Sequence, residues 1–205
     1  MEDCQVVKCD SLSDTEINAL SYQTAVSFLM HDGGWFPALG LSLKQVKEYM
    51  KALILTSLDH GSLYVAKDSE GNSMGVIQFT DSEHDVTLKQ AMVLLVRIAR
   101  AFGFQTCIKY IQTLGKQEES LESRLKKQHK PYVSIGMIAV FREYQGKGVM
   151  RKLMEQAFAY ADGLGYCTIV ETDTEDNSAR YEHLGMRFIQ TRKRTEDVTY
   201  YDLMR

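Results

Sequence analysis

Two glycines, Gly146 and Gly148, stand one residue apart in the segment "REYQGKGVMRKLME" (residues 142–155). The uncharged run "YVSIGMIAVF" before them predicts a β-strand, and apolar residues at every fourth position after them predict a helix over about 149–162. The first N–H groups of a helix have no intrahelical acceptor, and the helix dipole attracts anions to them. Glycines leave that backbone bare and adopt positive φ readily. The junction therefore predicts a diphosphate site, although a plain structural turn has the same pattern.

The charges around the junction favour the phosphate interpretation, because Lys147, Arg151 and Lys152 place positive charge at the same helix end. The usual nucleotide motifs do not fit. The segment does not contain the ATP-binding pattern GxxxxGK[ST]. It does not fit the dinucleotide-binding pattern GxGxxG either, because Arg151 occupies the position of the third glycine. The sequence thus argues against ordinary ATP and NAD sites and leaves a different diphosphate ligand.

The segment "IAVFREYQGKGVMRKLM" (residues 138–154) resembles the acyl-CoA-binding segment of the GNAT-type N-acetyltransferases, whose signature is Q/R-x-x-G-x-G/A. Gln145 and Gly148 match this signature, and Met150 departs from its final small residue. A second segment, "NSARYEHLGMRF" (177–188), is similar to a later region of that family, with a shorter spacing between Asn177 and Tyr181. The resemblance covers residues 132–188 well and includes the expected hairpin at 62–79, whereas residues 1–60 and 86–127 match only in being helical.

The resemblance implies that acetyl-CoA is the co-substrate, that no metal is needed, and that the pyrophosphate binds the main-chain amides of one short segment. These amides belong to Gln145, Gly146, Lys147, Gly148, Val149 and Met150. The pantetheine arm is expected to pair with the preceding strand at Ile138, Ala139 and Val140, where a backbone N–H also polarises the acyl carbonyl. Asn177 either contacts the pantetheine or caps a short helix over 177–184.

The chemistry that the resemblance implies is direct attack of a neutral amine on a thioester. Tyr181 takes the position of the tyrosine that hydrogen-bonds the CoA sulfur, so it is the candidate acid; the other interpretation is a core aromatic residue. Glu171 and Asp173 alternate onto one face of the strand "CTIVETDT", and Glu171 is the candidate base through water. An ordinary solvated carboxylate at Glu171, or a base at His84 or His129, remains open.

The predicted function is transfer of an acetyl or other acyl group from acetyl-CoA to the primary amine of a small-molecule or peptide acceptor, within a ternary complex. Trp35 and Phe36, beside two glycines, either line the acceptor pocket or anchor the core. The alternative function is a non-catalytic CoA-binding sensor or interaction module, and a regulator that binds another phosphate ligand is a third. The sequence does not identify the acceptor.

The predicted fold is α/β (α+β), with one domain over residues 1–205. A mixed, mostly antiparallel central sheet is expected to be flanked by helices, with a helical insert at 86–127 before the CoA-binding strand. Ser13 and Glu16 form a capping box that predicts a helix to about Met30, and a second helix is predicted from Ser42. A loop is expected at "HDGGWFPALG". The helical insert is expected to break near Gly103 and near Gly115. The chain is expected to end in an antiparallel hairpin around "RTED".

Composition sets the broad class. The chain has 205 residues, 44% of them hydrophobic, and a net charge of −3, which favours a globular protein and argues against a nucleic-acid partner. No signal peptide is visible, and the most apolar stretch carries Arg97, Arg100 and Lys109, too many charges for a membrane span. The four cysteines show no metal or disulfide spacing; they are Cys4, Cys9, Cys107 and Cys167. We expect a cytoplasmic protein with no membrane partner, and homodimer formation is left open.

Overall fold

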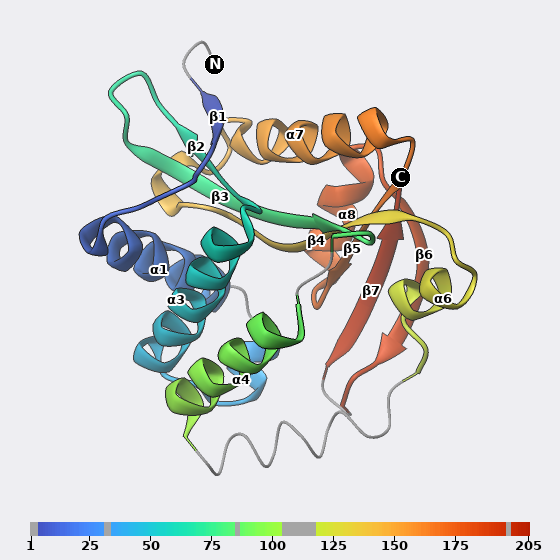
Figure 1. The fold of residues 1–205 in the computed structure, drawn as a ribbon, viewed down its shortest axis with the longest axis horizontal. Helices are drawn as coiled ribbons and strands as arrows, with labels where there is room; N and C mark the ends of the chain where they lie inside the picture. Colours follow the sequence, from blue (N-terminus) through green and yellow to red (C-terminus); the bar gives the residue numbers. More distant parts are fainter. Residues whose placement is uncertain (1–3, 31–33, 85–86, 104–117, 196–197) are drawn as a thin grey trace.

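A seven-stranded sheet with the strand order β1-β2-β3-β4-β5-β7-β6 runs through the molecule (Figure 1). The computed structural model describes residues 4–30, 34–84, 87–103, 118–195 and 198–205. All neighbouring strands are antiparallel except β4 and β5, which are parallel. The predicted mixed, mostly antiparallel sheet is therefore confirmed. The strands are β1 (Gln5–Lys8), β2 (Leu63–Lys67), β3 (Ser73–Asp81), β4 (Tyr132–Val140), β5 (Cys167–Thr172), β6 (Arg187–Lys193) and β7 (Thr199–Met204).

The long helices begin where the sequence places their caps. Ser13 and Glu16 close the predicted capping box of the first helix, and Ser42 pairs in the same way with Gln45 of the third. These reciprocal hydrogen bonds satisfy N–H groups that the helix itself leaves without acceptors. The helices are α1 (Asp14–Leu29), α2 (Trp35–Ala38), α3 (Leu43–His60), α4 (Leu88–Phe102), α6 (Leu121–Lys127), α7 (Val149–Leu164) and α8 (Glu175–His183), with the 3₁₀ turn η1 at Arg142–Tyr144.

Helices cover both faces of the sheet, with α7 on one face and α1 and α3 on the other (Figure 1). Because successive strand residues point to opposite faces, neighbours enter different cores. Val65 and Val76 lie in the core beneath α1 and α3, whereas Ala66 and Ile77 lie in the core beneath α7. The apolar positions predicted along α7, from Val149 to Ala161, are buried in that second core. The sheet is thus the middle layer that fixes the ends of β4 and β5.

The strands β4 and β5 separate part of the way along their length. Their pairing runs from Tyr132 opposite Cys167 to Ile135 opposite Val170, and β4 then continues to Val140 without a partner on that side among the described strands. The register between β3 and β4 shifts opposite Gly136, which marks a β-bulge. The separation leaves one edge of β4 open next to the end of β5.

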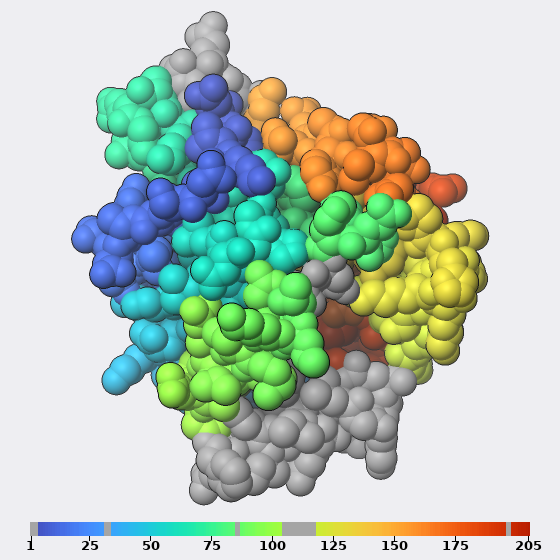
Figure 2. Space-filling model, viewed as in Figure 1, coloured from blue at the N-terminus to red at the C-terminus, as the bar shows by residue number. Residues whose placement is uncertain are grey.

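The described parts of the predicted insert are mostly helical, with residues 118–120 as a short non-helical segment. Helix α4 ends at the expected break, Gly103, and α6 is fixed to the sheet by Asp202 of β7, which accepts a hydrogen bond from the Leu121 amide at 3.0 Å. Asp202 also forms a buried ion pair with Arg192 of β6 at 2.9 Å. In Figure 2 the C-terminal strands (red) are visible between α4 (green) and the segment around α6 (yellow). The expected break near Gly115 and the cysteine Cys107 lie outside the described residues.

Two local expectations were wrong. The segment "HDGGWFPALG" was expected to be a loop, but Trp35–Ala38 form the single turn of α2. The last helix was expected to begin at Asn177, but α8 begins at Glu175 with Thr174 as its N-cap. Within the described residues, no helix is both long and apolar enough to cross a membrane, and no cluster of potential metal ligands occurs. The described cysteines are free thiols.

Candidate active site

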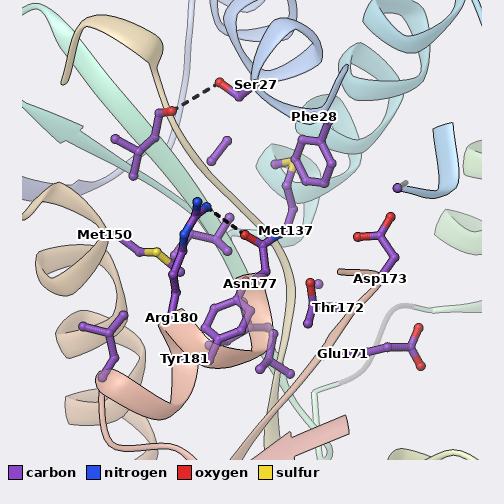
Figure 3. Close-up of a pocket in the computed structure, with 18 of the residues that line it drawn as sticks. Ser27, Phe28, Met137, Met150, Glu171, Thr172, Asp173, Asn177, Arg180 and Tyr181 are labelled. Carbon is purple, nitrogen blue, oxygen red and sulfur yellow. Dashed lines mark hydrogen bonds between the residues drawn. The ribbon is translucent and has the colours of Figure 1, made fainter. Parts of the chain in front are cut away.

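A cleft of about 1140 Å³ opens between the separated ends of β4 and β5 (Figure 3). Its walls combine the edge of β4, the glycine turn and first turn of α7, the end of β5, and helix α8. Residues of α1, α2, α3 and β7 complete the far end. The cleft therefore contacts almost every candidate site residue identified from the sequence. Those that line it are Ile138, Ala139, Val140, Gln145, Gly146, Gly148, Val149, Met150, Glu171, Asn177 and Tyr181.

The glycine turn has the geometry that the diphosphate prediction requires. Gly146 and Gly148 have φ values of 74° and 78°, a region that residues with a side chain adopt only with strain. Gly148 is the N-cap of α7, and no side chain caps the helix. The amides from Gly146 to Arg151 have no acceptor within the described part of the protein. N–H donors without protein acceptors therefore lie at the positive end of a helix that borders the cleft.

The basic residues near this turn do not all face the cleft. Arg151 lines it, but Lys147 does not: its ammonium lies 5.3 Å from the centre of the Tyr144 ring. Lys152 pairs with Glu155 of the same helix at 3.4 Å. Met150 lines the cleft and also packs, partly buried, against the core beneath α7. The backbone amides and one arginine are thus the positive groups at this end of the cleft.

The last carbonyl of β4 is held by two side chains from other segments. Gln145 donates from Nε2 to the Val140 carbonyl at 3.2 Å, and Ser27 of α1 donates from Oγ to the same oxygen at 3.3 Å. Gln145 therefore braces the turn against the strand that precedes it. Residues 136–139 of β4 also line the cleft, so their unpaired edge is available to an extended ligand.

Tyr181 occupies the middle of the cleft wall, on α8 (Figure 3). Its side chain is only 5% exposed, and its hydroxyl has no hydrogen-bond partner among the described residues. Burial, reinforced by the nearby Asp173 carboxylate, raises the pKa of Tyr181 above its ordinary value. The phenol is therefore protonated at neutral pH and can donate a hydrogen bond into the cleft.

Asn177 does not cap α8, because that position belongs to Thr174, whose hydroxyl accepts the Asn177 amide at 3.3 Å. The Asn177 side chain instead accepts a hydrogen bond from Arg180 at 3.0 Å, and Figure 3 shows the guanidinium extending across the cleft. Arg180 was not among the residues that we identified from the sequence. Its position three residues after Asn177, on the same face of a short helix, is a signal that could have identified it.

The two carboxylates at the end of β5 have different partners. Glu171 forms an ion pair with Arg192, whose side chain is buried. Asp173 accepts a hydrogen bond from the Trp35 amide of α2 at 2.6 Å, and its other carboxylate oxygen has no partner in the described residues. Neither His84, which contacts Asp81, nor His129 lines the cleft. Asp173 is thus the carboxylate of this pair that remains open to a ligand.

Aromatic side chains line the end of the cleft opposite the glycine turn. Trp35 and Phe36 belong to this wall and are also buried in the core beneath α1 and α3, so both interpretations of them from the sequence hold together. Phe28, Tyr49 and Tyr200 join them. We did not identify these last three from the sequence, because they come from separate segments and no local spacing connects them.

A family model for the GNAT acetyltransferases matches residues 42–186, more than half of the sequence. The chain therefore belongs to the acetyltransferase (GNAT) family. The match extends well beyond the segment that resembled this family in the sequence alone. It includes the glycine turn, the separated strands and Tyr181.

Solved structures share the fold at low sequence identity. A Corynebacterium glutamicum protein described as histone acetyltransferase HPA2 and related acetyltransferase is 14% identical, with a TM-score of 0.62 over 98% of this chain and 95% of that one. Arylalkylamine N-acetyltransferase 2 from Aedes aegypti is 14% identical, with a TM-score of 0.60 over 98% and 97%. The C-terminal condensation domain of Ebony, in complex with β-alanyl-dopamine, is 8% identical, with a TM-score of 0.65 over 100% and 99%. No curated protein matches the sequence.

Proposed function

We propose that this protein transfers an acetyl group from acetyl-CoA to the primary amine of a small-molecule or peptide acceptor, by direct attack within a ternary complex. The proposal depends on one observation: the amides from Gly146 to Arg151 have no acceptor in the described residues, and they border a cleft that Tyr181 also lines. Family membership and the arylalkylamine N-acetyltransferase named among the structural neighbours support it.

The glycine turn fits the pyrophosphate of the donor. A Cβ atom added to Gly146 would meet no other atom within 4 Å, so the absence of a side chain leaves open space beside the amides. In our proposal the amides of Gly146 to Met150 hold the two phosphates, while Arg151 and Arg180 add charge-assisted hydrogen bonds. The Gln145 amide, which the sequence had placed in this set, already donates to the Arg142 carbonyl at 3.4 Å. The open edge of β4 at Ile138 and Ala139 would pair with the amides of the pantetheine arm, whereas the Val140 carbonyl, also predicted to pair with it, already accepts from Gln145 and Ser27.

The reacting groups would meet where β4 and β5 separate. The amine nitrogen attacks the thioester carbon, the carbon–sulfur bond breaks, and the amine proton leaves to a base or to water. Only about one lysine-like amine in 10³ is neutral at pH 7, which costs about 4 kcal/mol. Holding both reactants in line offsets a cost of this size. A main-chain N–H near the β4 bulge would stabilise the oxyanion, and Tyr181 would donate to the departing sulfur.

We assign the proton relay from the amine to Asp173, acting through water. Its carboxylate lies close enough to Tyr181 to raise the pKa of that phenol, so it belongs to the same reacting region. The Trp35 amide holds one of its oxygens in place. Glu171, the base predicted from the sequence, is held in its ion pair with Arg192 and is the alternative relay.

Two measurements on the purified protein test this function. At 100 times its dissociation constant, acetyl-CoA is expected to raise the melting temperature by about 5–10 °C, because it binds the folded state alone. Thiol release is then followed with a panel of primary amines. Stabilisation with no thiol release from any amine would favour the non-catalytic sensor. Stronger stabilisation by ATP than by acetyl-CoA would favour the phosphate-binding regulator.

A further inference from the structure

We infer that the acceptor is a monocationic aromatic amine, in which a ring is joined to a primary amine by a short linker. The inference rests on the proposed function and names its substrate class. It depends on the far end of the cleft, which we call the aromatic wall and which consists of Phe28, Trp35, Phe36, Tyr49 and Tyr200.

The aromatic wall is held in place by ring contacts. Phe36 packs edge-on against Phe28 and Tyr49, with ring centres 5.9 and 5.2 Å apart. Tyr49 in turn stacks on Phe102 of α4 at 5.2 Å, and Trp35 meets Tyr200 edge-on at 6.4 Å. Rings fixed in this way bind a flat apolar group without having to become ordered themselves.

Part of this wall remains accessible. Trp35 and Phe36 are buried, but Phe28, Tyr49 and Tyr200 are only partly buried. In Figure 3 the Phe28 ring projects from α1 toward Met137 and the cleft. Apolar aromatic surface inside a cleft is the usual environment of a bound ring, with a few polar groups that orient the ligand.

Two of the cleft arginines lie near the glycine turn, and a carboxylate lies near the aromatic wall, where a third arginine, Arg194, is also present. Arg151 and Arg180 lie on α7 and α8 near the glycine turn, whereas Asp173 lies beside the aromatic wall through its hydrogen bond to Trp35. The other acid, Glu171, is paired with Arg192. Among the described residues that line the cleft, Asp173 is thus the carboxylate available to an ammonium group, next to a surface that suits a ring.

The aromatic wall disfavours a second positive charge on the acceptor. The Arg194 guanidinium lies over the rings of Trp35 and Tyr200, at 5.0 and 5.4 Å from their centres. These ring faces thus already interact with a cation. A second ammonium group on the acceptor would therefore meet ring faces that a guanidinium already covers.

The inference is tested by comparing acceptors on the wild-type protein at a fixed acetyl-CoA concentration. Thiol release is measured with 2-phenylethylamine, ethylamine and putrescine. We expect kcat/KM for 2-phenylethylamine to exceed that for ethylamine on the order of 100-fold, because the ring adds buried apolar surface, and to exceed that for putrescine by at least as much. Equal or faster reaction of ethylamine or putrescine would overturn the inference and leave the proposed function intact. Acetyl-CoA binding without transfer to any amine would instead remove the proposed function.

Variants on one helix test the aromatic wall itself. Phe28→Ala is expected to lower the preference for 2-phenylethylamine over ethylamine about tenfold, and Phe28→Leu, which keeps an apolar side chain, by less. Tyr22→Ala is the matched control, because Tyr22 is an exposed aromatic residue on the same helix and does not line the cleft. The stabilisation by acetyl-CoA should be unchanged in all three variants, which shows that they are folded. An unchanged preference in Phe28→Ala would overturn the inference.

Discussion

The two ends of the cleft are built in different ways. The phosphate end is one short segment, Gln145–Arg151, which offers mainly backbone N–H groups and depends on two glycines with positive φ, of which Gly146 leaves open space beside it. The acceptor end is a set of side chains from α1, α2, α3, β5 and β7. A site made from backbone depends on local conformation, whereas a site made from distant side chains depends on the whole fold. The former tolerates little change, and the latter can be altered one residue at a time.

The largest effect is expected from Gly148→Glu, which tests whether the backbone of the phosphate end binds acetyl-CoA. A glutamate there would place a side chain with a negative charge at the N-cap, in a left-handed conformation that costs about 1–2 kcal/mol. We expect at least about a 100-fold loss of acetyl-CoA affinity, measured as loss of the thermal shift. Gly71→Glu is the matched control, because Gly71 also has positive φ (86°) and lies in the β2–β3 turn, where an added Cβ would meet no other atom within 4 Å. Retained stabilisation in Gly148→Glu would refute the phosphate site.

Tyr181→Phe tests the reacting centre independently of the phosphate end and the acceptor end of the cleft. Removal of the hydroxyl should lower kcat about 100-fold, because the departing sulfur loses its hydrogen-bond donor, while the thermal shift with acetyl-CoA stays the same. Tyr22→Phe removes an equivalent hydroxyl from an exposed tyrosine, 47% exposed on α1, and should have no effect on either measurement. A wild-type rate in Tyr181→Phe would mean that the phenol is only a core residue.

The two ends should also respond differently to pH. An amine with a pKa near 10.4 gains neutral form about tenfold per unit between pH 7 and 9, so kcat/KM should rise about tenfold per unit. Because burial and Asp173 raise the pKa of Tyr181, the phenol stays protonated and the profile should show no falling limb in this range. Acetyl-CoA affinity, measured by titration at each pH, should stay nearly constant. A rate that falls between pH 8 and 9 would contradict the role of Tyr181.

The smallest effect is expected from Met150→Ala, which tests the departure from the family signature. Met150 lines the cleft but also packs against the core, so a smaller side chain should let the diphosphate approach more closely. We expect acetyl-CoA to bind about threefold more tightly and the unfolding free energy to fall by about 1 kcal/mol. Met92→Ala, at an exposed methionine on α4, should change neither value. A large loss of affinity would mean that the Met150 side chain itself contacts the donor.

Features that depend on local physics could be predicted from the sequence. Ser13 and Ser42 cap their helices as expected, and the glycine turn has the predicted position and positive φ values. The start of α8 was missed, although Thr174 followed by two acidic residues is a good N-terminal signal. A start at Glu175 places the acidic residues Glu175 and Asp176 at the positive end of the helix dipole, whereas a start at Asn177 would leave them outside the helix.

Features that depend on distant contacts could not be predicted. Trp35 begins a helical turn whose amide bonds Asp173, a residue 138 positions later in the chain. Glu171 looks equivalent to Asp173 in the sequence, and only the arrangement of β5, β6 and β7 shows that Arg192 holds it. The aromatic wall is the clearest example, because its members have no common spacing. The acceptor end of the site could therefore be located in outline but not described.

The separation of β4 from β5 has a further consequence for solubility. Unpaired strand edges invite pairing with other chains and so promote aggregation. Here the unpaired stretch lies inside a cleft rather than at the rim of the sheet, whose outer strands are β1 and β6. Its terminal carbonyl, that of Val140, is already occupied by Ser27 and Gln145. The fold thus keeps a bare strand edge for its own use while shielding it from neighbouring molecules.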